Sequence, residues 1–432
     1  MADARDIAYN ILLDIESNNT FSNIAISKAL RQNQFSEKTE RAFITRLAEG
    51  VTEYRINLDY IINSFSKTKI NKCKPAIRCL LRMGTYQIIY MDGVPDSAAC
   101  NESVKLAKKH GFASLSGFVN GVLRNIARNK NEIKYPDKDN DRTEYLSVKY
   151  SIPEWLVEKI SSDFPDYAET IIKASFSERA TTIRVNTLKT DVDALKVLLQ
   201  EKNINVENGK YCDKALVISN YDFVRKIPGY KQGLFTVQDE SSMCSVMAAQ
   251  IKPGDTVIDV CAAPGGKTTA AAECLQGKGI VYSMDISEDK LELIEDNVQR
   301  LGLDNVKISA HDATEELLID GQKIDADVVI VDVPCSGMGI IGRKNDIKYH
   351  LSKEQLDELV VLQRKILTTV KEYVKKGGTL LYSTCTINPD ENKNNVKWFL
   401  ENNKEFVLEK ERLFLQGIDE CDGFYYAIIK KI

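Results

Sequence analysis

Several common kinds of functional site are missing from the sequence of this 432-residue chain. Only three histidines occur, and no two of the ten cysteines have Cys-x-x-Cys spacing, so we expect no metal site. No run of about 18 apolar residues exists, so we expect no membrane span. The start "MADARDIAYN" lacks the basic-then-apolar order of a signal peptide. We therefore expect a cytoplasmic protein with free thiols.

A complete phosphate-binding loop is also missing, although one stretch comes close to it. The stretch "VIDVCAAPGGKTTAAA" (257–272) contains Gly266, Lys267 and Thr268, the three residues that close a P-loop. A P-loop also needs a glycine five positions before Gly266, and that position is Cys261. The residues downstream must therefore decide which ligand this turn binds.

The net charge of −4 is distributed unevenly along the chain. Residues 1–130 carry a net charge of about +7, residues 131–230 about −2 and residues 231–432 about −9. A positive first part is typical of a nucleic-acid-binding surface, although a solvated helical surface gives the same count. The length predicts roughly two to three domains.

Hydrophobic periodicity predicts the domains. Apolar residues at spacings of three and four predict helices throughout 1–130, and the polar stretch 131–144 predicts a linker. Residues 145–230 read as a small α/β unit, with strands at 181–186 and 215–219.

The remaining part, 233–432, alternates strands and helices, which predicts an α/β fold with a doubly wound, mostly parallel sheet. We predict its strands at 255–260, 279–285, 305–312, 326–334, 379–385 and 424–431. Ligands of such sheets bind beyond the carboxyl ends of the strands. Candidate site residues recur at these strand ends. They are the loop Cys261, Ala262, Ala263, Pro264, Gly265, Gly266 and Lys267, then Asp285, Asp312, Asp332 with Cys335, and Cys385. This repetition indicates one functional site and not a set of solvated strand caps.

Asp285 argues against an ATPase. A carboxylate at the end of the second strand accepts hydrogen bonds from a ribose diol, whereas it would repel a triphosphate. Asp312 can bind the exocyclic amine of an adenine, and Gly265 and Gly266 let the backbone approach a ligand. The NAD fingerprint GxGxxG is absent, so these features favour S-adenosylmethionine as the cofactor.

Two thiols beside a methyl donor narrow the chemistry to cytosine methylation. Carbon 5 of cytosine is a poor nucleophile until a cysteine thiolate attacks carbon 6. Asp332 can stabilise protonation of the ring nitrogen, and a second cysteine has a role when the product is released. The spacing alone does not decide which of Cys335 and Cys385 attacks.

The motifs "DVCAAPGGKT" (259–268), "DVPCSGMG" (332–339) and "STCTINPDEN" (383–392) resemble the RNA cytosine-5 methyltransferases of the NOL1/NOP2/Sun type. The segment "SGFVNGVLRN" (116–125) and the helical part around it resemble the NusB-like RNA-binding domain. This pairing is similar to a bacterial branch that methylates one cytosine in a hairpin loop of 16S ribosomal RNA. The fold implied is a Rossmann-like methyltransferase core after an all-α domain and a small α/β subdomain.

The resemblance implies a role for each motif. Cys385 would be the nucleophile and Cys335 would assist product release, while residues 261–267 with Asp285, Asp312 and Asp332 would bind S-adenosylmethionine. Cys261 would only line the cofactor site. The substrate implied is 16S ribosomal RNA, the small subdomain would contact RNA, and we expect a monomer.

The sequence departs from the family pattern in small ways. Thr386 stands where serine is usual, and Gly342 and Asn345 stand where arginine and proline are frequent. The loop in question, "GRKNDIK" (342–348), brings Arg343, Lys344 and Lys348 as the residues expected to grip RNA phosphates. A non-catalytic ribosome-assembly or antitermination factor stays a second hypothesis, but it would not need both thiols. A P-loop ATPase is the third.

Overall fold

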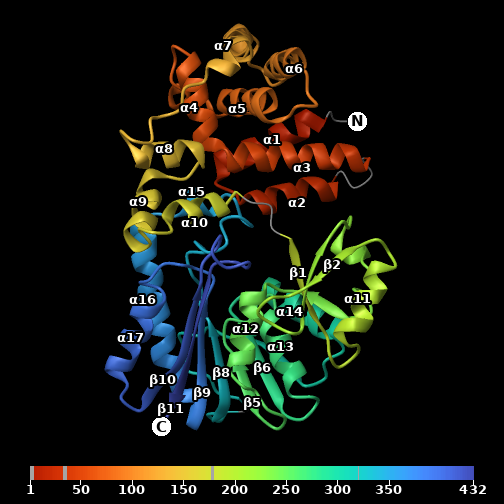
Figure 1. The fold of residues 1–432 in the computed structure, drawn as a ribbon, viewed down its shortest axis with the longest axis vertical. Coiled ribbons are helices and arrows are strands. Elements are labelled where there is room, and N and C mark those ends of the chain that lie inside the picture. Colours follow the sequence, from red (N-terminus) through yellow and green to blue (C-terminus); the bar gives the residue numbers. More distant parts are fainter. Residues whose placement is uncertain (1–3, 33–36, 177–179, 320) are drawn as a thin grey trace. The chain divides into compact units, whose positions relative to one another are not determined.

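The protein divides into two units in the computed structural model, which describes residues 4–32, 37–176, 180–319 and 321–432. Figure 1 shows the helices and strands coloured along the sequence. The first unit comprises Met1–Phe176 and Ile341–His350, and the second comprises Ser177–Ile340 and Leu351–Ile432. Within the described ranges, no helix has the length and apolar character needed to cross a membrane.

The first unit is helical, as its apolar spacing predicts. Its central helix is α5 (Pro75–Tyr90), most of whose residues from Ala76 to Ile88 are buried and which packs against five other helices (Figure 1). Pro75 at the first position suits a helix start, because proline has no amide hydrogen to leave unbonded. These five are α1 (Ala4–Asn18), α3 (Lys38–Glu53), α4 (Arg55–Phe65), α6 (Asp96–Lys109) and α7 (Ser116–Asn129), whereas α2 (Ser22–Gln32) packs on α1 and α3.

Three further helices, α8 (Arg142–Lys149), α9 (Glu154–Asp163) and α10 (Ala168–Ala174), belong to the first unit. The sequence predicts a domain boundary at residue 145, whereas contacts in the structure place residues up to Phe176 with the helical unit. Hydrogen bonds to α4 explain the difference: Asn57 Nδ2 donates to Val148 O at 3.1 Å, and Ile56 N donates to Ser151 Oγ at 2.8 Å. Such long-range bonds leave no local signal in the sequence.

The segment Ile341–His350, which contains α15 (Ile347–His350), also belongs to the first unit. Lys348 is only 1% exposed, and its Nζ donates to Glu53 O at 3.0 Å and lies 4.5 Å from the centre of the Phe176 ring. Burial lowers the pKa of Lys348 to about 7. The expectation that Lys348 grips RNA phosphates is therefore wrong, because its ammonium group is enclosed by protein. Arg343 and Lys344 are exposed.

The second unit starts with a small antiparallel sheet of order β2-β3-β1-β4. Its strands are β1 (Thr181–Val185), β2 (Asn205–Asn208), β3 (Ala215–Ser219) and β4 (Phe235–Val237). The helix α11 (Val192–Gln200) packs on this sheet through buried leucines such as Leu195. Strands β1 and β3 match the sequence prediction, whereas β2 and β4 were not predicted because each is short.

The large sheet has the order β10-β11-β9-β8-β5-β6-β7, and the five strands from β9 to β7 are parallel. Its strands are β5 (Thr256–Asp259), β6 (Ile280–Asp285), β7 (Val306–Ala310), β8 (Ala326–Asp332), β9 (Val374–Thr384), β10 (Phe406–Phe414) and β11 (Phe424–Lys431). Strands β10 and β11 are antiparallel to their neighbours. The prediction of a doubly wound, mostly parallel sheet is confirmed.

Helices cover both faces of this sheet (Figure 1). Alternate residues of β8 face opposite cores: Val328 and Ile330 pack with α12–α14, and Val329 and Val331 pack with α16 and α17. The helices are α12 (Glu240–Ala248), α13 (Gly266–Cys274), α14 (Glu288–Leu301), α16 (Lys353–Val370) and α17 (Lys393–Asn402). Because both faces are buried, the strands read as continuous apolar runs in the sequence.

Strand β10 was not predicted. Its sequence "FVLEKERLF" has exposed charged residues through the middle and buried residues at Phe406 and Phe414. It is one of the two edge strands of the sheet, and its one neighbour in the sheet order is β11. Charged side chains are common on edge strands because they oppose pairing with other chains.

Candidate active site

The residues singled out in the sequence follow the carboxyl ends of the parallel strands. Because β9, β8, β5, β6 and β7 run in one direction, these ends share one edge of the sheet. Asp285 and Asp332 are the last residues of β6 and β8, and Cys385 directly follows β9. Asp312 lies two residues beyond β7, so it is the only one of these four set back from its strand end.

The loop after β5 turns tightly into α13. Gly265 has a φ of 95° and precedes the first residue of α13, a left-handed conformation that favours glycine. A Cβ at Gly265 would also lie 3.3 Å from the Ile294 Cα. The Ala262 N donates to Met284 O at 2.8 Å, which holds the loop against β6. The turn therefore leaves its backbone close to the strand ends.

Asp285 fastens this loop from the side of β6. Its Oδ2 accepts from Ala263 N at 3.1 Å, and its Oδ1 accepts from Ile286 N at 2.9 Å. Lys290 Nζ lies 3.3 Å from Oδ1. Oδ1 already has two donors, whereas Oδ2 has one and can accept a second hydrogen bond from a ligand hydroxyl.

Lys267 makes an ion pair inside the site. Its Nζ lies 2.6 Å from Asp332 Oδ2 and 4.9 Å from the centre of the Phe424 ring. Ser383 Oγ donates to the other Asp332 oxygen at 2.7 Å. Lys267 is buried and Asp332 is one-third exposed, so the pair presents its carboxylate side to the open part of the site. A P-loop lysine would instead project toward a phosphate.

Asp259, the last residue of β5, was missed as a site residue. It is fully buried, Thr268 Oγ1 donates to its Oδ2 at 2.7 Å, and its Oδ1 has no hydrogen-bond partner among the residues that the structure describes. Burial raises its pKa to about 7. Its place at the end of the strand "VID" was a usable signal, because a carboxylate at the end of an apolar strand is unusual. It directly precedes the loop that starts at Val260, and its hydrogen bond to Thr268 links the end of β5 to α13.

The two thiols lie together. Cys335 Sγ and Cys385 Sγ are 3.1 Å apart, although 50 residues separate them in the sequence. Both side chains are half-buried. The hydrogen bond to Cys385 and burial raise the pKa of Cys335. The loops are joined directly as well, since Gly339 N donates to Cys385 O at 3.1 Å.

Cys261 and Asp312 differ from these central residues. Burial raises the pKa of the Cys261 thiol, whose side chain packs against the core under β5 and β8. A thiol of this kind is inert, which fits a lining residue. Asp312 accepts from Thr314 N at 2.8 Å, and this hydrogen bonding lowers its pKa, so it is ionised at neutral pH.

A buried arginine connects the small sheet to the site and was also missed. Arg184 of β1 is 1% exposed, donates to Gly266 O at 2.9 Å, and pairs with Glu273 Oε1 of α13 at 2.9 Å. Only the tertiary fold reveals this contact, because an arginine within a strand is usually exposed. The first turn of α13 is thus held by β1.

The chemistry of these groups fits S-adenosylmethionine. The carboxylates of Asp285 and Asp312 suit a ribose diol and an adenine amine, and Asp259 ends the strand that leads into the glycine turn. Among the described residues, no group of three or more His, Cys, Asp or Glu side chains could hold a metal ion.

Comparisons with known proteins agree with this arrangement. The family model described as 16S rRNA methyltransferase RsmB/F matches residues 246–429. The NusB family model matches 2–128, and the RsmF/B-like ferredoxin-like domain matches 152–224. The Rossmann-like core after a NusB-type all-α domain is thereby confirmed.

Curated relatives and solved structures match over nearly the whole chain. The probable ribosomal RNA small subunit methyltransferase B of Bacillus subtilis (strain 168) is 35% identical over 99% of this chain and 98% of its own length. The ribosomal RNA small subunit methyltransferase B of Vibrio vulnificus (strain YJ016) is 30% identical, with 99% of each chain covered. The crystal structure of PH0851 superposes with a TM-score of 0.83 at 26% identity, covering 100% of this chain and 99% of that chain.

The raised pKa of Asp259 predicts how stability depends on pH. Between about pH 4 and pH 7 Asp259 holds its proton more in the folded protein than in the unfolded chain, so the contribution of Asp259 to the free energy of unfolding falls as pH rises. We expect Asp259→Asn, which cannot titrate, to make this fall shallower in urea unfolding measured across that window. Asp304→Asn, at an exposed carboxylate, is the control. Equal slopes for wild type and Asp259→Asn would contradict the prediction.

Proposed function

We propose that this chain, which belongs to the RsmB/F family of 16S rRNA methyltransferases, methylates carbon 5 of one cytosine in 16S ribosomal RNA through a covalent cysteine–cytosine intermediate. The observation that carries the proposal is the pair of thiols 3.1 Å apart, beside the glycine turn and the Lys267–Asp332 pair. Cytosine-5 methylation needs one sulfur to attack the base, and the second sulfur stands where it can act on the adduct. Neither an assembly factor nor an ATPase has a use for this pair.

Cys385 is the proposed nucleophile. Its sulfur bonds to carbon 6 of the base, which makes carbon 5 able to take a methyl group. S-adenosylmethionine supplies that group as an electrophilic methyl. The proton on carbon 5 then passes to water, its bonding pair restores the ring double bond, and the bond between Cys385 and carbon 6 breaks with its electron pair on the Cys385 sulfur. Cys335, 3.1 Å away, assists this release by hydrogen bonding to the departing sulfur.

The hydrogen bond between the thiols supports this division of roles. The hydrogen bond to Cys385 and burial raise the pKa of Cys335, so Cys335 keeps its proton at neutral pH. The attacking form of a cysteine is the thiolate, so a thiol that keeps its proton is a poor nucleophile. Cys385 is therefore the better candidate for the nucleophile.

Carboxylates of the chain would position the ligands. Asp285, Asp312 and the loop 261–267 would hold S-adenosylmethionine, and Asp332 would contact both the cofactor and the cytosine ring. Lys267 and Ser383 fix the two oxygens of Asp332, so its carboxylate is oriented before any ligand binds. It can then stabilise the protonated ring nitrogen while the base is attached to Cys385.

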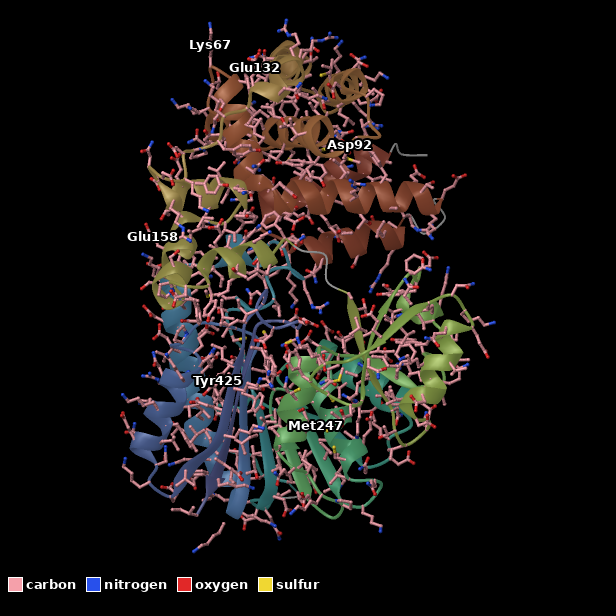
Figure 2. The ribbon with its side chains drawn as sticks, viewed as in Figure 1. Lys67, Asp92, Glu132, Glu158, Met247 and Tyr425 are labelled. Atoms are coloured by element: carbon pink, nitrogen blue, oxygen red, sulfur yellow. The ribbon has the colours of Figure 1, made fainter. Side chains whose placement is uncertain are left out.

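The first unit would bind the ribosomal RNA. Lys67, Lys69, Lys72 and Lys74 are exposed between α4 and α5 and form what we call the lysine loop. Figure 2 shows the Lys67 side chain pointing away from the helices of this unit. Asn125 Nδ2 donates to Phe65 O at 2.9 Å, which places α7 beside the start of the loop. Closely spaced lysines neutralise phosphates without reading sequence. We expect the protein to act as a monomer in the cytoplasm.

Methyl mapping tests the proposed reaction. We expect the protein, incubated with unmodified 16S RNA and labelled S-adenosylmethionine, to place the label on carbon 5 of a single cytosine. Thermal shifts should show stabilisation by S-adenosylhomocysteine and none by ATP, because a ligand that binds the folded state raises the melting temperature. Label on another atom, or stabilisation by ATP alone, would contradict the proposal.

The roles of the thiols predict opposite phenotypes for two variants. We expect Cys385→Ala to abolish methylation and form no adduct, because the attacking sulfur is gone. We expect Cys335→Ala to accumulate a covalent protein–RNA complex, seen as a shifted band in a denaturing gel, because release is slowed. Cys274→Ala, at the half-buried thiol that ends α13, is the control and should retain methylation. An adduct with Cys385→Ala would reverse the assignment.

The lysine loop predicts a change in salt dependence. Replacing its four lysines with glutamine should weaken RNA binding and flatten the plot of log affinity against log salt by roughly 0.7 to 0.9 per lost phosphate contact. Binding measured by filter retention at several salt concentrations checks this. The matched control replaces four exposed lysines of the second unit, Lys393, Lys397, Lys404 and Lys410. Equal losses in both variants would mean that the loop has no special part in binding.

A further inference from the structure

A carboxylate beneath the two thiols has no part in the mechanism described so far. Glu391 is fully buried and lies in the loop that joins β9 to α17. Its Oε1 accepts from Ser336 Oγ at 2.5 Å and from Asn388 Nδ2 at 3.0 Å. Its Oε2 accepts from Ser336 N and from Gln363 Nε2, both at 2.9 Å. All four donors are uncharged groups.

A buried carboxylate surrounded by uncharged donors is costly, because burial disfavours its charge. Four hydrogen bonds offset much of this cost, and they also fix the donors in place. A glutamine at this position could accept on one side only, so only a carboxylate satisfies all four donors. The four donors therefore depend on this one side chain for their acceptor.

The donors are the neighbours of the two thiols. Ser336 directly follows Cys335 and gives Glu391 both its amide and its hydroxyl hydrogen bond. Ser336 Oγ also lies 2.7 Å from Thr386 Oγ1, and Thr386 directly follows Cys385. The residues that follow the two cysteines, Ser336 and Thr386, thus contact each other through their hydroxyl groups, and Ser336 is bound to the Glu391 carboxylate.

Further contacts hold the Cys385 side of this arrangement. Asn392 Nδ2 donates to Thr386 O at 2.9 Å, and Thr384 Oγ1 donates to Asn392 Oδ1. Asn392 therefore binds both chain neighbours of Cys385. The Tyr382 OH donates to Glu391 O at 2.5 Å, so β9 also fixes the backbone of the carboxylate residue.

We propose that Glu391 is a positioning residue that sets the separation between the sulfurs of Cys335 and Cys385, and that it thereby controls release of the methylated base. The inference rests on the proposed function for its second half, whereas the thiol separation can be measured without any RNA. It also explains why threonine works in place of serine at 386: the hydroxyl that meets Ser336 is present in both residues.

A dithiol reagent tests the separation directly. Phenylarsine oxide bonds to two thiols only where both sulfurs can reach one arsenic atom, and each thiol loses its proton as the arsenic oxygen leaves as water. We expect the wild-type protein to bind one equivalent of phenylarsine oxide more than the Cys335→Ser variant. Glu391→Gln should weaken this binding by on the order of tenfold or more, because small displacements in such sites have large effects.

The second readout is the fate of the adduct. In a single turnover with RNA and S-adenosylmethionine, Glu391→Gln should raise the ratio of covalent complex to released product by on the order of tenfold, as a milder form of Cys335→Ala. Affinity for S-adenosylhomocysteine and the melting temperature of the cofactor complex should stay near wild type. A merely structural role would lower these values and leave the ratio unchanged.

Matched variants separate the outcomes. Asp390→Asn makes the same chemical change at the neighbouring exposed carboxylate and should behave as wild type. Thr386→Ser keeps the hydroxyl and should also behave as wild type, whereas Thr386→Val should share the defect if Glu391→Gln fails to fold. Unchanged arsenical binding in both Glu391→Gln and Thr386→Val would overturn the inference. If arsenical binding is weaker in the variants but the wild-type protein does not methylate RNA, only the proposed function would be overturned.

Discussion

The parallel pairing of β8 with β9 is the constraint on which the site depends. Its register sets Asp332 opposite Ser383, and a hydrogen bond between their side chains marks this pairing. Three residues beyond Asp332 comes Cys335, and two residues beyond Ser383 comes Cys385. A slip of one residue would turn each side chain of one strand to the opposite face of the sheet. Backbone pairing in the middle of a buried sheet thus brings the two cysteine-bearing loops side by side, and contacts within the loops then bring the sulfurs to 3.1 Å.

The site holds several carboxylates, and each is accommodated by a different physical means. Asp285 is held by backbone amides, Asp332 by the Lys267 ammonium, and Glu391 by four neutral donors. Asp259 has one hydroxyl donor, and burial raises its pKa. Each carboxylate has its own partners, so the site holds several of them with only one buried lysine, Lys267, as an ion-pair partner. Hydrogen bonds to the other carboxylates offset the cost of burying them. The arrangement is in place in the protein alone, as electrostatic preorganisation requires.

The sequence predicts the strand-end residues well because they follow from chain order and strand direction alone. Asp285, Asp332 and Cys385 are recognisable at the ends of apolar runs, and parallel strands bring such ends together. The supporting residues are not predictable in this way. Glu391 and Arg184 look like surface residues in the sequence, and only long-range contacts reveal that they are buried. The prediction that Lys348 contacts RNA is wrong for the same reason, because only the tertiary fold shows that this lysine is buried. The domain boundaries stay a prediction.

The distribution of charge suggests a division of labour within the chain. Residues 231–432, which carry the thiols, have a net charge of about −9 and would repel RNA phosphates as a whole. The buried Lys348 removes one cation that the sequence offered near the site. Under the proposed function, electrostatic attraction to RNA would therefore come mainly from the helical residues 1–130, with a net charge of about +7. Affinity for RNA and chemistry on the base would then be properties of different parts of the chain, so a substitution in one part would weaken one property without abolishing the other.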